Sequence, residues 1–124
     1  MTTTERAVVA DIMTTPIETV KPDAPLIEAA KTIGEKEIGA LLVTTAPPSI
    51  VTATDVLEAV AQGRDTSKLD VADVMTESVE TVPPDLSLNE TAAMMDNFRI
   101  DHLPVLEDDY VGMVSSTAIV AHLA

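Results

Sequence analysis

Three polar side chains, Thr52, Thr54 and Asp55, stand together in the segment SIVTATDVL at residues 49–57. The segment is a short apolar run followed at once by helical spacing, which predicts a strand that passes into a helix. At such a junction, free backbone N–H groups and the helix dipole favour an anion, and nearby hydroxyls add donors for a phosphate or carboxylate. A carboxylate at the same corner suits hydroxyl donors instead, such as a ribose diol. Together, these residue types indicate a nucleotide site.

Helix capping is a second interpretation of the same corner. Thr54 is expected at the N-cap position, and Asp55 would then serve only the first turn of the helix. This interpretation leaves Thr52, two residues earlier, without a role. A third and more distant interpretation is a hydrolase that uses Asp55.

A second copy of the corner, GMVSSTAIV, occupies residues 112–120. It keeps two hydroxyls, at Ser115 and Thr117, and Thr117 stands at the expected N-cap position. Ala118, however, replaces the carboxylate of Asp55, and a methyl group cannot hold a ribose. We therefore expect one competent site and one weak or vacant site.

The two corners belong to an internal repeat that covers nearly the whole chain. Residues 11–33, DIMTTPIETVKPDAPLIEAAKTI, align with residues 73–95, DVMTESVETVPPDLSLNETAAMM, at a constant offset. A slip of a single residue in a later turn then brings the two corners into alignment. The repeat predicts two copies of one structural unit, at residues 7–62 and 71–123, joined by a polar linker at residues 63–70.

Each copy has the same predicted order of elements. Alternation around Val20 or Val82 predicts a short strand, and helical spacing predicts the helix that follows. Two β-rich segments separated by a turn come next, and a last helix begins near Thr54 or Thr117. The order β-α-β-β-α gives an α+β fold class. Because a unit of roughly 50 residues cannot bury its apolar face alone, we expect the copies to pack as one pseudo-twofold module.

Acidic residues dominate the charge of the chain. Seven Lys and Arg stand against 21 Asp and Glu, which gives a formal net charge of −14. Such a field repels phosphate backbones, so we expect no nucleic-acid partner. Salt screens the self-repulsion, because the Debye length falls to about 3 Å at 1 M ionic strength. We therefore expect an adaptation to high salt, as in a halophile.

Several classes of site are disfavoured by the residues present. The chain has no cysteine, which excludes disulfides and thiolate sites. His102 and His122 lack the paired spacing of a metal site, and no glycine-rich phosphate loop or nucleophile elbow occurs. We expect no catalytic residue, no metal and no required cofactor. The lack of a long apolar run and of a basic leader predicts a cytoplasmic protein with no membrane contact.

The doubled β-α-β-β-α order, the openings DIMT and DVMT, the HLPV strand and the IVTATDVL ending resemble a tandem pair of CBS domains, the cystathionine-β-synthase-type repeat. The resemblance covers residues 7–123. It implies a pseudo-twofold module whose two clefts bind adenosyl compounds such as AMP, ADP, ATP or S-adenosylmethionine. It also implies that two modules associate as a flat disc, which predicts a homodimer.

The resemblance assigns residues to the two clefts. In the first cleft, Thr52 and Thr54 would hold a phosphate or its equivalent, and Asp55 would hold the ribose hydroxyls. Asp101 departs from the basic side chain that some relatives carry near the phosphates. The other residues assigned to this cleft are Val79, Glu80 and Ile100 for the adenine, and His102 near the phosphates. The second, weaker cleft would use Ile17, Glu18, Ile38, Gly39, Ala40, Ser115 and Thr117.

These implications add up to a regulatory, non-enzymatic module that binds an adenosyl ligand. The sequence shows no effector domain, so we expect regulation in trans, on a protein that the sequence does not name. The alternative is a dimerisation or interaction scaffold whose clefts hold no nucleotide. Binding that Asp55→Ala abolishes would favour the sensor, and failure of every adenosyl compound to bind would favour the scaffold.

Overall fold

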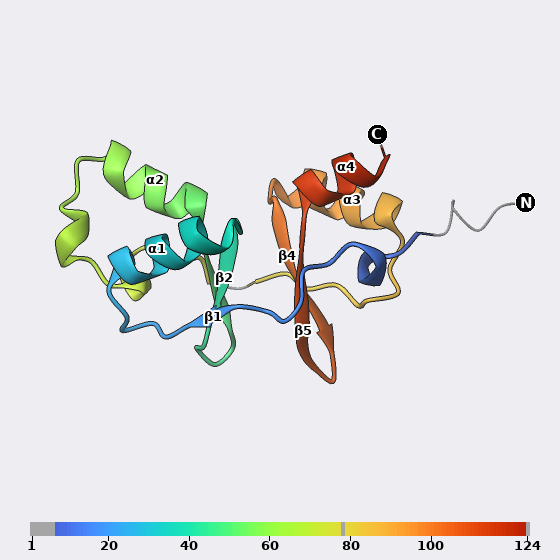
Figure 1. Ribbon diagram of the computed structural model, residues 1–124, viewed down its shortest axis with the longest axis horizontal. Helices are drawn as coiled ribbons and strands as arrows, with labels where there is room; N and C mark the ends of the chain where they lie inside the picture. Colours follow the sequence, from blue (N-terminus) through green and yellow to red (C-terminus); the bar gives the residue numbers. More distant parts are fainter. Residues whose placement is uncertain (1–6, 78, 124) are drawn as a thin grey trace, which may run out of the picture. The chain divides into compact units, whose positions relative to one another are not determined.

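The computed structural model describes residues 7–77 and 79–123, and their contacts divide into two compact units (Figure 1). Unit 1 combines the amino-terminal segment, up to Ile17, with the chain from Glu80 onward. Unit 2 is the intervening stretch Glu18–Val79. Helices and short sheets occur in both units, so the α+β fold class predicted from the sequence is confirmed.

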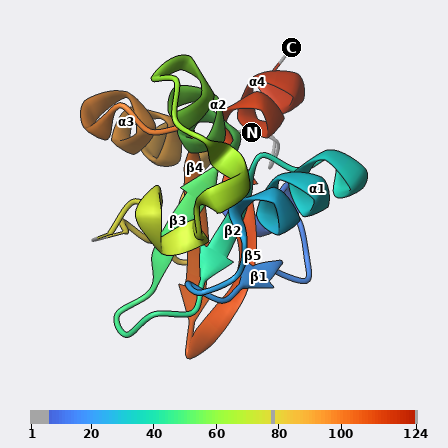
Figure 2. The same ribbon diagram turned by 90° about the vertical axis from the view of Figure 1, so that its left-hand side faces the viewer.

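Unit 2 is built on a three-stranded sheet with the order β1-β2-β3. β1 runs parallel to β2, and β2 runs antiparallel to β3. β3 passes directly into α2, with no intervening loop, as the sequence predicts for the corner at residues 52–55 (Figure 2). The elements are β1 (Thr19–Val20), α1 (Leu26–Lys36), β2 (Ala40–Val43), β3 (Ser49–Thr52), α2 (Ala53–Ala61) and the 3-10 turns η3 (Thr66–Lys68) and η4 (Val71–Asp73).

The core of unit 2 lies between its helices and the sheet. α1 buries Leu26, Ala29 and Ile33, whose spacing places them on one face of the helix. Alternate residues of the strands meet this face, because successive side chains of a strand point to opposite sides of the sheet. The buried cluster consists of Leu26, Ala29, Ile33, Leu41, Val43, Val51, Ala59 and Val71.

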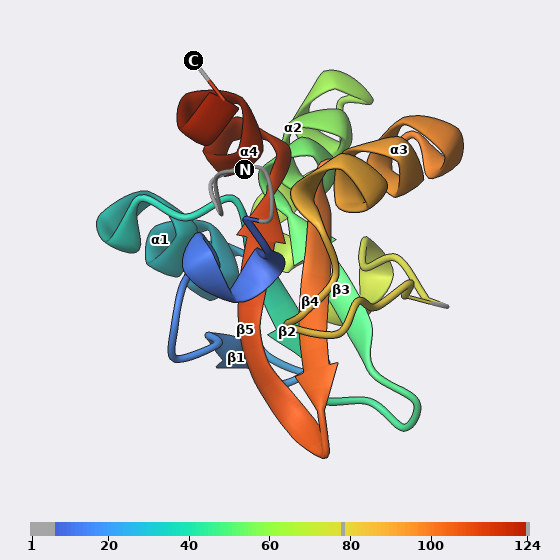
Figure 3. The same cartoon turned by 90° about the vertical axis from the view of Figure 1, so that its right-hand side faces the viewer.

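Unit 1 is built on a long antiparallel hairpin, β4-β5, with α3 and α4 lying over one end of it (Figure 3). Its elements are η2 (Val9–Asp11), α3 (Leu88–Phe98), β4 (His102–Glu107), β5 (Asp109–Ser115) and α4 (Ser116–Leu123). Its buried core consists of Val9, Val82, Leu88, Met95, Leu103, Val105, Val114 and Ile119.

The strand expected around Val82 is only an isolated parallel bridge between Val82 and Val105. The short strand predicted there is thus reduced to one bridge, whereas its counterpart around Val20 forms the two-residue strand β1. In unit 2 the Leu42 N–H donates to the Glu18 carbonyl at 3.0 Å, whereas Pro104 stands at the equivalent position of β4 and has no N–H to extend the ladder back from Val82.

The opening segment of each repeat packs on the unit built mainly from the other repeat. In unit 1, Thr14 and Met113 exchange two backbone hydrogen bonds of 2.8 and 3.1 Å. In unit 2, Thr76 and Ile50 exchange two bonds of 2.8 and 2.9 Å. Unit 1 is therefore built from two stretches of the chain and unit 2 from one. In each unit the opening segment of a repeat pairs with the strand that leads into the last helix, β5 or β3.

Gly112 permits the close approach of the amino-terminal segment to β5. A Cβ atom at this position would lie 2.8 Å from the Thr14 carbonyl oxygen and 3.0 Å from the Met13 sulfur. Carbon does not fit at the first of these distances without a shift of backbone. Glycine is therefore required here by packing rather than by backbone torsion.

Candidate functional site

The Thr52–Asp55 corner forms a complete capping box at the start of α2. The Asp55 N–H donates to Thr52 Oγ1 at 3.1 Å, and the Thr52 N–H donates to Asp55 Oδ2 at 2.9 Å. Thr52, in extended backbone conformation, is thus the N-cap residue. The prediction that Thr54 caps the helix was wrong, because α2 begins at Ala53 and Thr54 lies exposed within its first turn.

Capping leaves the polar groups of this corner partly available to a ligand. Thr52 Oγ1 accepts the Asp55 N–H, so its own O–H proton remains free to donate to an anion. Asp55 Oδ2 is taken by the Thr52 N–H, while Oδ1 has a single long contact, 3.5 Å, with the hydroxyl of Thr76. The carboxylate therefore serves the first helical turn, as the capping interpretation requires, and still presents one oxygen.

Unit 1 contains half of the same capping box. The Ala118 N–H donates to Ser115 Oγ at 3.1 Å, so Ser115 caps α4. The prediction that Thr117 caps this helix was wrong, since Thr117 lies exposed inside it. Ala118 has no oxygen to return a bond to the backbone of Ser115. The asymmetry expected from the sequence thus corresponds to one complete capping box and one incomplete one.

The start of β4 lies beside the Ser115 corner. His102 pairs with Ser115 across the hairpin, and the Ser116 hydroxyl donates to Asp101 Oδ1 at 3.2 Å. Burial lowers the pKa of His102 below its usual value, and the charge of neighbouring Asp101 opposes this effect. Because His102 is therefore neutral near pH 7, it does not supply a positive charge for phosphates.

The start of β2 lies in the same way beside the Thr52 corner. Ala40 pairs with Thr52, and the Ala53 N–H donates to the Gly39 carbonyl at 2.9 Å. In both units, therefore, the strand start that the sequence assigned to one cleft adjoins the hydroxyl corner that it assigned to the other.

Each predicted cleft draws residues from both units. Unit 2 carries Thr52, Thr54, Asp55 and Val79 of the first cleft, and unit 1 carries Glu80, Ile100, Asp101 and His102. For the second cleft, unit 1 carries Ile17, Ser115 and Thr117, and unit 2 carries Glu18, Ile38, Gly39 and Ala40. The contacts that the structure gives within a unit join Thr52 to Asp55 and to Ala40, and His102 to Ser115.

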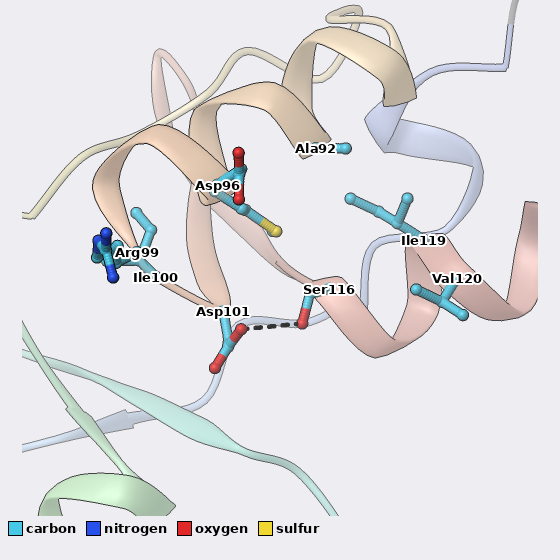
Figure 4. A pocket seen from close by; sticks show the side chains of 9 residues that line it. Ala92, Asp96, Arg99, Ile100, Asp101, Ser116, Ile119 and Val120 are labelled. Atoms are coloured by element: carbon cyan, nitrogen blue, oxygen red, sulfur yellow. Dashed lines mark hydrogen bonds between the residues drawn. The ribbon is translucent and has the colours of Figure 1, made fainter.

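A hollow of about 630 Å³ lies between α3 and α4 in unit 1 (Figure 4). Buried Met95 and Ile119 are among its lining residues. Asp101 and Ser116, joined by a hydrogen bond, also line it, as Figure 4 shows. Of the residues predicted from the sequence, Ile100 and Asp101 line it. Its volume is that of a small-molecule pocket. The remaining lining residues are Ala92, Asp96, Arg99 and Val120.

A second hollow, of about 530 Å³, lies beside β1 in unit 2. Its lining includes the charged residues Lys21, Asp23 and Glu28. None of the residues predicted for either cleft lines it. Over the described ranges 7–77 and 79–123, no group of three or more His, Asp or Glu residues is arranged to hold a metal.

The comparison with protein families agrees with this arrangement of two similar units. A family model for the CBS domain matches residues 9–62 and 71–124. The chain belongs to the CBS-domain family. The tandem CBS pair proposed from the openings DIMT and DVMT is thus confirmed.

This chain matches very different shares of two similar proteins. A homoserine O-acetyltransferase from Methanohalobium evestigatum is 33% identical over 116 residues, which are 90% of this chain and 23% of that protein. The CBS domain-containing protein YhcV from Bacillus subtilis is 32% identical over 111 residues, which are 86% of this chain and 79% of that protein. The chain thus spans less than a quarter of the first relative.

A solved structure links the CBS fold to an adenosyl ligand. The CBS domain pair of protein MJ0100, in complex with 5′-methylthioadenosine and S-adenosyl-L-methionine, superimposes with a TM-score of 0.84 at 28% identity. The match covers 95% of this chain and 100% of that one.

No helix in the described part of this CBS pair is long and apolar enough to cross a membrane.

Sequence reasoning missed Thr76, which lies 3.5 Å from the Asp55 carboxylate. The signal for it was the repeat itself, because Thr76 aligns with Thr14 in the two MT openings. The opening segment of each CBS repeat, and not only the strand-to-helix corner, brings a hydroxyl residue next to the last strand of the other repeat.

Proposed function

We propose that this CBS pair is a regulatory module that binds an adenosyl ligand at the Thr52–Asp55 corner. The observation that carries the proposal is the complete capping box, which orients one carboxylate and one hydroxyl at a strand-to-helix junction. Thr52 and Thr54 donate to the phosphate or its equivalent, and Asp55 accepts from the ribose diol. Val79, Glu80 and Ile100 contact the adenine, and Asp101 and His102 adjoin the phosphate end.

Charge and chemistry both suit this assignment. The helix dipole at the start of α2 attracts an anion, and the Thr52 O–H adds a donor. The dipole also stabilises the carboxylate of Asp55, whose Oδ1 atom can accept from a hydroxyl. The MJ0100 CBS pair, which binds adenosyl compounds, supports the ligand class.

The second cleft, with Ser115 and Thr117, is weak or vacant in this proposal. Its corner lacks a carboxylate because Ala118 stands where Asp55 stands in the first copy. A ribose in this cleft would lose the charge-assisted hydrogen bonds that Asp55 offers, each worth roughly 1.5–3 kcal/mol. The other residues of this weaker cleft are Ile17, Glu18, Ile38, Gly39 and Ala40.

The module regulates rather than catalyses. A ligand that binds one arrangement of the two CBS repeats more tightly than another shifts the population toward that arrangement. A partner protein that distinguishes the two arrangements is then regulated in trans. Affinity capture with and without the ligand is the experiment that would identify the regulated protein.

Exposed apolar side chains support self-association into a homodimer. Leu57 and Val60 on α2 are 67% and 56% exposed, and Val120 and Leu123 on α4 are 67% and 61% exposed. Each helix thus carries a pair of large apolar side chains in water, which a second copy of the module would cover. Sedimentation of the chain and of the double variant Leu57→Asp and Val120→Asp tests this, with a monomer expected for the variant.

Calorimetric titration tests ligand binding. AMP, ATP and S-adenosylmethionine are each titrated into the unaltered chain, into Asp55→Ala and into Asp73→Ala. Asp73 is the matched control, because its carboxylate also accepts a backbone N–H, from Asp70 at 2.8 Å, but serves the turn η4. We expect binding of an adenosyl compound to the unaltered chain and to Asp73→Ala, and none to Asp55→Ala.

The same titration separates the competing functions. No heat with any of the three compounds favours a dimerisation scaffold over a sensor. Formation of ADP or phosphate from ATP, measured by chromatography of the same samples, favours a hydrolase. Equal binding by the unaltered chain and Asp55→Ala contradicts the assigned corner.

A further inference from the structure

Thr76 lies next to the Asp55 carboxylate. Its backbone exchanges two hydrogen bonds with Ile50 on β3, which leads without a loop into the Thr52–Asp55 corner. The carboxylate is held by the Thr52 N–H through its other oxygen. The two residues therefore lie side by side in unit 2, although 21 positions separate them in the sequence.

Both oxygens keep most of their hydrogen-bonding capacity. Thr76 Oγ1 lies 3.5 Å from Asp55 Oδ1, which is beyond the range of about 2.5–3.0 Å for good O–H···O bonds. A hydroxyl has one proton and two lone pairs, and a carboxylate oxygen has two lone pairs. Thr76 is exposed and Asp55 is half-buried, so a ligand can reach the space beside the pair.

We propose that Thr76 is a further ligand-binding residue, and that Thr76 Oγ1 and Asp55 Oδ1 form a two-point clamp for a vicinal diol. This inference rests on the proposed adenosyl function. One hydroxyl of the ribose donates to Asp55 Oδ1, and the adjacent hydroxyl bonds Thr76 Oγ1. Two acceptors at this separation match the two neighbouring oxygens of a diol better than a single alcohol. The clamp therefore selects ribose over deoxyribose.

The other unit provides an internal comparison. Thr14 is held against Met113 by two backbone hydrogen bonds, as Thr76 is held against Ile50. The corner beside it has Ala118 in place of a carboxylate, so Thr14 has no partner for a clamp there. Thr14→Val is thus a matched control for Thr76→Val, with the same substitution on the same kind of segment.

The test measures discrimination between ribose and deoxyribose. AMP, 2′-deoxy-AMP and 3′-deoxy-AMP are titrated calorimetrically into the unaltered chain, Thr76→Val, Thr76→Ser and Thr14→Val. Valine keeps the shape of threonine and removes its hydroxyl, and it leaves the backbone bonds to Ile50 intact. We expect Thr76→Val to weaken AMP binding by roughly three- to tenfold, the loss of one hydrogen bond.

The deoxy ligands distinguish a clamp from a merely structural role. For one of the two deoxy compounds, Thr76→Val should cause little further loss, because the missing hydroxyl already removes that bond. Thr76→Ser and Thr14→Val should retain the affinities of the unaltered chain. A loss that is equal for all three ligands would mean that Thr76 acts on the fold alone, and would overturn the clamp.

Failure of the clamp is distinguishable from failure of the proposed function. If Asp55→Ala abolishes AMP binding while Thr76→Val leaves every affinity unchanged, the adenosyl site stands and the role of Thr76 is refuted. If neither AMP nor S-adenosylmethionine binds the unaltered chain, both proposals are overturned. Thermal unfolding of each variant verifies that the compared chains are folded.

Discussion

Thr52 and Asp55 bond each other twice, backbone to side chain in both directions, at 2.9 and 3.1 Å. The equivalent pair, Ser115 and Ala118, bonds once. The two strand-to-helix corners share the hydroxyl cap and differ by the Asp55 carboxylate, which Ala118 lacks. In the first, that carboxylate completes the helix cap and also presents an oxygen to the surroundings, so stability and ligand binding depend on the same side chain.

The cap residue of α2 can be identified by a pair of threonine variants. Thr52→Ala removes the hydroxyl that accepts the Asp55 N–H and should lower the free energy of unfolding by about 0.5–2 kcal/mol. Thr54→Ala, on the exposed first turn, should change it by less than about 0.5 kcal/mol. Urea denaturation of both variants measures the difference, and a larger loss for Thr54→Ala would contradict the assignment.

Gly112 should tolerate no side chain. Gly112→Ala places a methyl group 2.8 Å from the Thr14 carbonyl, and overpacking of this kind costs about 1–3 kcal/mol. Gly34→Ala is the control, because its Cβ meets nothing within 4 Å and alanine favours the α1 helix by about 1 kcal/mol. Thermal melts should move in opposite directions. A Gly112→Ala chain as stable as the unaltered one would contradict the close approach of residues 13–14 to β5.

His102 should make the fold less stable in acid. Burial lowers the pKa of His102 in the folded chain, so the unfolded chain binds the proton more tightly. The contribution of His102 is therefore present above the unfolded pKa of about 6.5 and is lost as pH falls below it. His102→Gln should flatten this part of the profile of unfolding free energy between pH 7 and 5. An unchanged slope in the variant would contradict the assignment.

The acidic charge should make stability depend on salt. A formal net charge of −14 produces self-repulsion, and salt at molar concentration screens it over about 3 Å. Only two salt bridges, Lys36–Glu18 and Lys68–Asp65, occur among the residues that the structure describes, and both involve exposed lysines. We expect the melting temperature to fall on dialysis from 2 M to 0.1 M KCl. Equal melting temperatures would count against adaptation to high salt.

The repeat could be predicted from the sequence because its two copies align at a constant offset. The order of the elements could be predicted because hydrophobic spacing within each segment indicates a helix or a strand. The N-cap could not be placed exactly, since hydrophobic spacing marks the buried face of α2 and leaves its first turn undefined by two residues. The choice between Thr52 and Thr54 was wrong for this reason. The strand around Val82 is reduced to a bridge because Pro104, at the position equivalent to Leu42, has no N–H to donate.

Non-local contacts were beyond sequence reasoning. The pairing of Thr76 with Ile50, and of Thr14 with Met113, joins segments from different repeats, and no periodicity in a single segment indicates such a partner. The proximity of Thr76 to Asp55 follows from that pairing. The difference between the two corners, in contrast, was visible in the sequence as Asp55 against Ala118.

A crystal structure of the chain with S-adenosylmethionine or AMP would show which corner holds the ligand. We predict ligand density at the Thr52–Asp55 corner, with the ribose diol facing the Asp55 carboxylate, and an empty or weakly occupied corner at Ser115 and Ala118. Density at the Ala118 corner with none at Asp55, or a ribose that faces away from Asp55, would contradict it.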